Sequence, residues 1–131
     1  MAIVLSKGSA ALTLPDGLYW SDEHNWQPVV QSAEYSLTGA LIVESAIKLA
    51  GRPITLTADE DRAWMPRSDL DTLYAWASST PVAMTLIYHG RTASVIFRHN
   101  DPPAIQARPL WETWPPAGTD WLIATIKLME L

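Results

Sequence analysis

Residues 82–98 read VAMTLIYHGRTASVIFR, and this stretch does most to decide the fold. β-Branched and aromatic side chains fill both halves of it. His89-Gly90 lies between the halves as a two-residue turn of the kind that joins antiparallel strands. The stretch therefore predicts a β-hairpin with strands over 82–88 and 91–98.

Toward the C-terminus the sequence continues in strands and loops. Asn100-Asp101-Pro102-Pro103 closes the hairpin, and Ile105–Leu110 is typical of an edge strand, where Pro109 is tolerated. Trp111–Asp120 is rich in Trp, Pro and Gly and predicts a loop. Trp121–Met129 predicts a final strand.

Upstream of the hairpin lies the one segment with helical periodicity. It follows Trp64-Met65-Pro66, and Ser78-Ser79-Thr80-Pro81 ends it. Apolar residues recur at helical spacing, namely Leu70, Leu73, Tyr74 and Ala77. Ser68 is a suitable N-cap, and the acidic residues that follow it complement the helix dipole. We expect a helix over about residues 69–78 that packs one face across a sheet.

The N-terminal third predicts short strands and turns. Ala2–Leu5 and Ala10–Leu14 flank a turn at Ser6–Ser9, and Pro15-Asp16-Gly17 marks a second turn. Leu18–Trp26 then predicts an exposed loop between aromatic anchors.

Val29–Leu37 alternates and predicts a strand, whereas Leu41–Leu49 fits either a helix face or a strand. Its β-branched residues and the Gly51-Arg52-Pro53 turn favour a strand that forms a hairpin with Ile54–Thr57. Ala58–Arg62 follows as an acidic loop.

Composition limits the classes of protein to consider. The 131 residues are 48% apolar and 18% charged, which predicts one folded domain over residues 1–131. The chain has no cysteine, a net charge of −5 and no basic cluster, which argues against disulfides, thiolate metal sites and a nucleic-acid surface. Met1–Leu14 lacks the pattern of a signal peptide, and no apolar run is long enough for a membrane span.

Candidate catalytic and metal-binding residues form no diagnostic pattern. His24, His89 and His99 lack metal-site spacing, and they would need carboxylates such as those of Asp22, Glu23 or Asp101 close by. No nucleophile motif or phosphate-binding loop occurs, so we expect no enzyme and no cofactor. The acidic run Asp59-Glu60-Asp61 could bind a cation, although such a run is more often a solvated loop.

Seven tryptophans and ten prolines are many for this length. Tryptophan provides large contact area at low entropic cost, so several of these residues should lie at contacts. One alternative is a carbohydrate-binding or receptor-binding β module with exposed stacking residues, namely Trp20, Trp26, Trp111 and Trp114. The predicted helix counts against that alternative, because carbohydrate modules are usually sandwiches of strands alone.

The order of elements resembles the tube-type fold of bacteriophage tails. It runs through Ala50–Leu56, the acidic loop, Trp64, one helix and the hairpin Met84–Arg98, and it is similar to distal tail and baseplate ring proteins. The resemblance covers roughly residues 30–130 and implies a mostly β (α+β) fold. That fold is an antiparallel β-sandwich or partly closed barrel flanked by one α-helix.

The resemblance also implies a function. It is that of a structural protein of the virion tail, assembled in the host cytoplasm as a homo-oligomeric ring, commonly hexameric, that links the tube to the tip. DNA would be only a passing cargo, and the partners would be other tail and baseplate proteins. We expect subunit contacts at Trp26, Trp64, Trp111 and Trp114 and in the loop from Asp59 to Arg62. Many distal tail proteins are larger, which leaves open a terminator, connector or minor baseplate protein.

Overall fold

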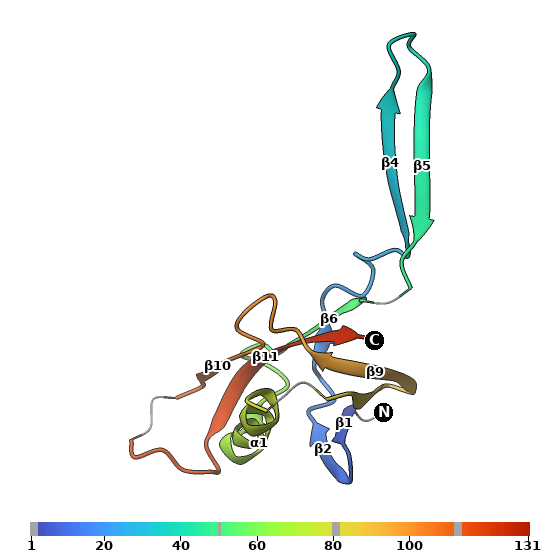
Figure 1. Ribbon diagram of the computed structural model, residues 1–131. Helices are drawn as coiled ribbons and strands as arrows, with labels where there is room; N and C mark the ends of the chain where they lie inside the picture. The colour runs from blue at the N-terminus through green and yellow to red at the C-terminus, as the bar shows by residue number, and fades with distance from the viewer. Residues whose placement is uncertain (1–2, 50, 80–81, 112–113) are drawn as a thin grey trace.

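The computed structural model describes residues 3–49, 51–79, 82–111 and 114–131 (Figure 1). Within these ranges the protein is mostly β, with antiparallel strands and one helix, as the sequence predicted. The elements are β1 (Ile3–Lys7), β2 (Ala10–Leu14), β3 (Tyr19–Trp20), β4 (Val29–Tyr35), β5 (Leu41–Ile47), β6 (Pro53–Thr57), β7 (Met65–Pro66), α1 (Arg67–Ala77), β8 (Met84–Tyr88), β9 (Arg91–Phe97), β10 (Ile105–Pro109) and β11 (Trp121–Glu130).

β11 is the central strand of a nine-stranded sheet with the order β2-β1-β8-β9-β11-β6-β3. One edge of β11 pairs with β10 and then β9, and the other pairs with β7 and then β6. Among the described strands, β2 and β3 end this order without pairing with each other, so the sheet is not closed into a barrel.

The curved sheet encloses one contiguous apolar core. Alternate residues of β6 and β11 point inward, and Leu56, Ile126 and Leu128 are fully buried. The curvature also brings β8 against β3, where the rings of Trp20 and Tyr88 meet edge to face with centroids 5.8 Å apart. This sheet and its core are called the body below.

The helix confirms the predicted periodicity but not the predicted cap. Leu70 and Leu73 are buried against the sheet, whereas Tyr74 is half exposed. The helix begins at Arg67, two residues before the predicted start, and Pro66 precedes it without a side-chain cap. Ser68 lies inside the first turn, so its prediction as the N-cap is wrong. Pro66 in β7 pairs with Trp121 and keeps an extended backbone with ψ of 149°, so the helix begins at the next residue.

The hairpin predicted from residues 82–98 is confirmed as β8 and β9. His89 and Gly90 form its turn with φ of 47° and 90°, the left-handed conformation that two-residue hairpin turns require. The N-terminal hairpin β1–β2, the edge strand β10 and the final strand β11 are confirmed as well.

Residues 41–47 form a strand, the alternative that the sequence favoured over a helix. The predicted hairpin of this strand with Ile54–Thr57 is wrong. β5 pairs with β4 over seven residue pairs to form a separate two-stranded sheet. A turn at residues 36–40 closes this pair, and Gly39 supplies its positive φ of 85°. Both edges of β6 are already occupied, by β11 and by β3, which leaves β5 no place beside it.

Candidate functional site

β4 and β5, with the turn between them, form a hairpin that projects from the body (Figure 1). We call residues 29–47 the arm. Every residue of both strands is exposed, whereas each strand of the body has at least one residue that is buried or partly buried. Seven residues at about 3.3 Å each give its strands a length of roughly 23 Å.

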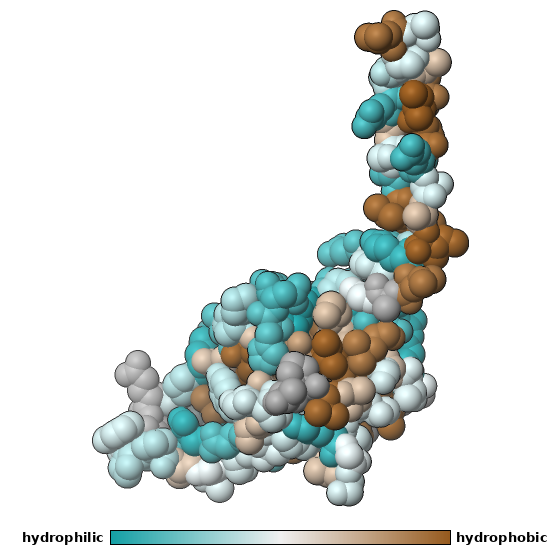
Figure 2. Space-filling view, viewed as in Figure 1, coloured by the Kyte–Doolittle hydropathy of each residue, from teal (hydrophilic) through white to brown (hydrophobic). Residues whose placement is uncertain are grey.

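The two faces of the arm differ in charge: the apolar face is uncharged and mostly apolar, and the acidic face carries two glutamates among apolar residues. Cross-strand partners share a face, and successive pairs alternate between faces. The apolar face carries the pairs Val29–Ile47, Gln31–Ser45, Ala33–Val43 and Tyr35–Leu41. The opposite face carries Val30–Ala46, Ser32–Glu44 and Glu34–Ile42. Figure 2 shows hydrophobic residues along the length of the arm, with hydrophilic residues between them.

The apolar face of the arm is uncovered. Tyr35 is 77% exposed, Ile47 70% and Leu41 56%. A two-stranded hairpin is at best marginally stable in water, and large apolar residues exposed together on one surface usually mark interaction sites. The arm is therefore the first candidate for a functional surface.

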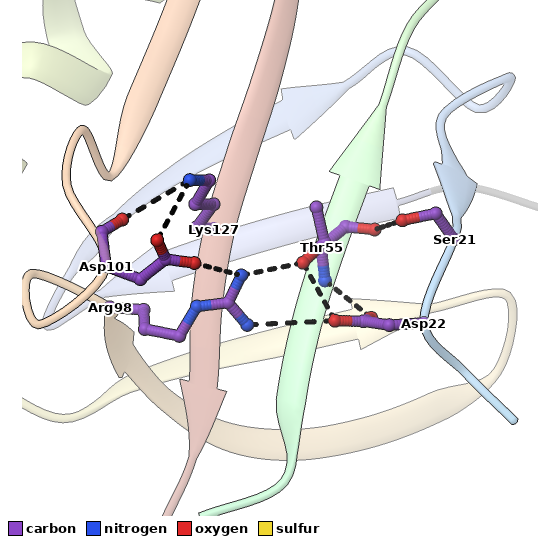
Figure 3. Close-up of polar contacts among 6 residues, drawn as sticks. All are labelled: Ser21, Asp22, Thr55, Arg98, Asp101 and Lys127. Atoms are coloured by element: carbon purple, nitrogen blue, oxygen red, sulfur yellow. Dashed lines mark hydrogen bonds and ion pairs between the residues drawn. The ribbon is translucent and has the colours of Figure 1, made fainter. Parts of the chain in front are cut away.

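A polar network joins the chain segments that precede and follow the arm (Figure 3). Asp22, before the arm, accepts hydrogen bonds from the backbone N–H and the hydroxyl of Thr55, after it, at 2.9 and 2.8 Å. Arg98, whose side chain is 11% exposed, donates to the Thr55 hydroxyl at 2.8 Å and lies 3.7 Å from the Asp22 carboxylate. Asp101 joins Arg98 to Lys127 through ion pairs of 3.5 Å each. These charge-assisted bonds are strong, so the network ties the segments on either side of the arm to the body.

Three tryptophans gather at the other end of β11. The ring centroid of Trp64 lies 6.2 Å from that of Trp111 and 6.5 Å from that of Trp121. Trp64 and Trp121 also line an open groove of about 440 Å³, together with Pro15, Gly17 and Ala63. We call this groove, together with Trp111 beside it, the tryptophan groove.

The loop from Asp59 to Arg62 lies next to the tryptophan groove. Asp59 and Arg62 form a 3.5 Å ion pair and a bridge across the loop, and the Glu60 carbonyl accepts the indole N–H of Trp64 at 2.8 Å. Asp61 and Arg62 line the groove. The structure thus brings together four of the predicted contact residues: Asp59, Arg62, Trp64 and Trp111.

The other two predicted contact residues lie elsewhere. Trp26 is half-buried at the base of the arm, where the Lys48 ammonium lies 4.8 Å from its ring centroid. Trp114 is 88% exposed.

Trp20, expected on an exposed loop, is only 5% exposed, and that expectation is wrong. β3 pairs with β6 and turns the indole inward, and the Arg52 guanidinium stacks 4.7 Å from its ring centroid. A pocket of about 440 Å³ opens beside it, lined also by Arg91 and Glu23, which form a 2.7 Å ion pair. The guanidinium groups of Arg52 and Arg91 already cover the Trp20 ring. Trp20 therefore lines the pocket, but its ring face is not free to stack on a sugar.

The three histidines are dispersed in the structure. His89 lies in the β8–β9 turn, where its ring contacts Tyr88, and His99 follows β9, where its ring contacts Phe97. His24 lies 3.7 Å from Glu23 on the surface. Among the described residues no three His, Asp or Glu side chains are grouped as a metal site would require. Nor do the described ranges contain a helix long and apolar enough to cross a membrane.

The sequence matches no protein-family model and no curated protein.

The arm itself was missed as a functional surface. Its signal was available in the alternation of Val29–Leu37, where one face is apolar and the other holds Glu34. The sequence alone does not show that Val43 and Ile47 share the apolar face of residues 29–35, because this depends on the β4–β5 register. Trp121 was assigned to a strand and was not recognised as a member of the tryptophan groove.

Proposed function

We propose that this protein is a non-enzymatic structural component of a long-tailed bacteriophage tail, a distal tail or baseplate ring protein that links the tube to the tip. The observation that supports it is the arm, whose apolar face finds no cover in the described part of its own chain. A surface of this size and chemistry belongs to a protein that works by assembly.

Unpaired strand edges support the same conclusion. Within the described sheet β2 pairs only with β1, β3 only with β6, and each strand of the arm only with the other. Exposed edges of this kind are a hazard to a monomer, because they template pairing with other chains. In a ring of about six copies each edge and each arm meets a neighbour, and closed symmetry ends the growth.

Charge fits the proposed position in the virion tail. The chain carries a net charge of −5, and the acidic face of the arm adds Glu34 and Glu44 to the surface. A lumen lined by such surfaces lets DNA pass as cargo without binding it. Assembly takes place in the host cytoplasm with other tail and baseplate proteins, and the role needs no cofactor.

The mass of the purified protein in solution tests the proposal. Light scattering and negative-stain imaging should give closed rings of about six copies at micromolar concentration. A twofold dimer, an open filament or a monomer at every concentration would contradict the proposed ring.

A carbohydrate-binding or receptor-binding module is the second candidate. Trp111 is 63% exposed and Trp114 88% exposed, and both belong to the segment between β10 and β11. Aromatic faces in such a loop can stack on sugar rings. Binding of a glycan by the monomer, lost in Trp114→Ala and kept in a matched arm variant such as Tyr35→Ala, would favour this function over the ring.

A further inference from the structure

The arm and the tryptophan groove lie at opposite ends of the body. Trp121 begins β11, and the last residue of β11, Glu130, exchanges backbone hydrogen bonds of 2.8 and 2.9 Å with Arg52 and Gly51 at the base of the arm. Ten residues of strand separate these ends by roughly 30 Å. The arm then extends away from the body (Figure 1). An arm therefore cannot reach the groove of its own chain.

We infer that the apolar face of the arm packs into the tryptophan groove of a second copy of this chain. The inference rests on the proposed ring assembly and identifies the two surfaces that form its subunit interface. The contact is head-to-tail, since one copy contributes its arm and the next contributes its groove.

Surface area favours this pairing. Five large residues of the apolar face are 47–77% exposed, namely Val29, Tyr35, Leu41, Val43 and Ile47. Since a large side chain presents roughly 150–250 Å² when bare, they leave on the order of 500 Å² of apolar surface. One partner of a standard interface buries about 800 Å². The arm supplies most of that share, and its turn, with Leu37 fully exposed, can supply more.

Stoichiometry favours a second copy over an unrelated protein. Each chain carries both surfaces, and Trp64, Trp111 and Trp121 are 38–63% exposed in the groove. A different protein that covered the arm would leave the groove bare. Head-to-tail contact covers both surfaces of every copy, and it produces a ring when the rotation between copies closes.

Charge orients the arm in the groove. The apolar face bears no charged residue, while the face that would remain turned to water carries Glu34 and Glu44 beside Val30 and Ile42, each 51% exposed. The groove is lined by Asp16, Asp61 and Arg62 as well as by Trp64 and Trp121. Interface cores are enriched in aromatic residues and depleted of charge, so the uncharged face of the arm suits the tryptophans and the face with the glutamates suits water.

Introduced cysteines test the contact directly, because the chain has none of its own. We expect Val43→Cys, on the apolar face, and Asp61→Cys, in the groove, to form a disulfide-linked dimer when the two variants are mixed and oxidised. Glu44→Cys, the neighbour of Val43 on the opposite face, is the matched control and should react at least about fivefold less. Equal yields from both arm variants would overturn the inference, as would Val43→Cys joining only to itself.

Complementation provides a test that does not depend on disulfide geometry. Val43→Asp damages the arm and leaves the groove, while Trp64→Ser damages the groove and leaves the arm. Each variant alone should be monomeric at concentrations where the unmodified chain assembles. A mixture should form dimers that stop at two copies, because only one intact contact is possible. A mixture that stays monomeric although both variants melt cooperatively would overturn the inference.

The outcomes separate this inference from the proposed function. Rings that form without the Val43–Asp61 cross-link keep the ring proposal and overturn the arm–groove contact. Open filaments joined by that cross-link support the contact and overturn the ring. A monomer at every concentration with no cross-link overturns both.

Discussion

The body and the arm are built from the same kind of strand, yet one buries its apolar face and the other does not. In β6 and β11, Leu56, Ile126 and Leu128 are fully buried. In the arm, Leu41, Val43 and Ile47 share one face of β5, as buried residues do in a body strand, but they are 47–70% exposed. Both regions are antiparallel and both alternate.

Alternation therefore determines a strand and its faces, while a second layer determines burial. The body strands curve over one another, so their inward faces share one core. The arm leaves the sheet between Asp22 and Thr55, and no element within the described chain crosses it. An apolar face that the described part of the chain does not cover supports the proposed assembly.

Leucine truncation should give the largest difference in stability between a variant of the body and a variant of the arm. Leu56→Ala removes a fully buried side chain and should lower the free energy of unfolding by about 2–5 kcal/mol. Leu41→Ala, the same substitution on the arm, should change the stability of the monomer by less than about 0.5 kcal/mol. Urea unfolding of both variants at a concentration where the protein is monomeric measures this difference. Equal losses would mean that the arm packs against its own body.

The polar network at the base of the arm should have the next largest effect. Asp22→Ala removes two hydrogen bonds to Thr55 and one ion pair to Arg98, which is mostly buried, and should cost about 1.5–3 kcal/mol. Asp101→Ala removes a carboxylate that is 58% exposed and should cost less than about 1 kcal/mol. Thermal unfolding of the two variants compares them. Similar losses of stability in the two variants would mean that the exposed ion pair of Arg98 with Asp101 stabilises the protein as much as its contacts with Asp22 do.

The local elements of the body could be predicted because their signals are local. The β8–β9 hairpin carries its own turn residues, and α1 carries its own periodicity. The pairing of β5 was missed because two candidate partners, residues 29–37 and 54–57, both look like strands. Only long-range pairing decides between them, and β11 and β3 occupy both edges of β6.

The candidate site was predictable in part for the same reason. The sequence identified Trp64, Trp111 and the loop from Asp59 to Arg62, since tryptophan and charge stand out without a fold. It gave no sign that Trp121 would meet Trp64, because these residues are 57 positions apart and join through the β7–β11 pair. Nor could composition indicate that Trp20 would be turned inward by its pairing with β6.

Removal of the arm should have little effect on stability and the largest effect on assembly. Lys48 donates its backbone N–H to the Pro28 carbonyl at 2.6 Å, so the two ends of the arm already adjoin. Replacing residues 29–47 by Asn-Gly, a two-residue hairpin turn, should therefore close the gap and change the free energy of unfolding by less than about 1 kcal/mol.

Denaturant unfolding and the mass in solution together measure the outcome of this replacement. A body that folds without the arm and no longer assembles would mean that the arm serves the contact between chains. A body that unfolds would mean that the arm stabilises its own chain through contacts beyond the network at its base. The body and the arm would then differ in exposure, but both would stabilise the fold of their own chain. Since the arm buries so little in its own chain, we expect the first outcome.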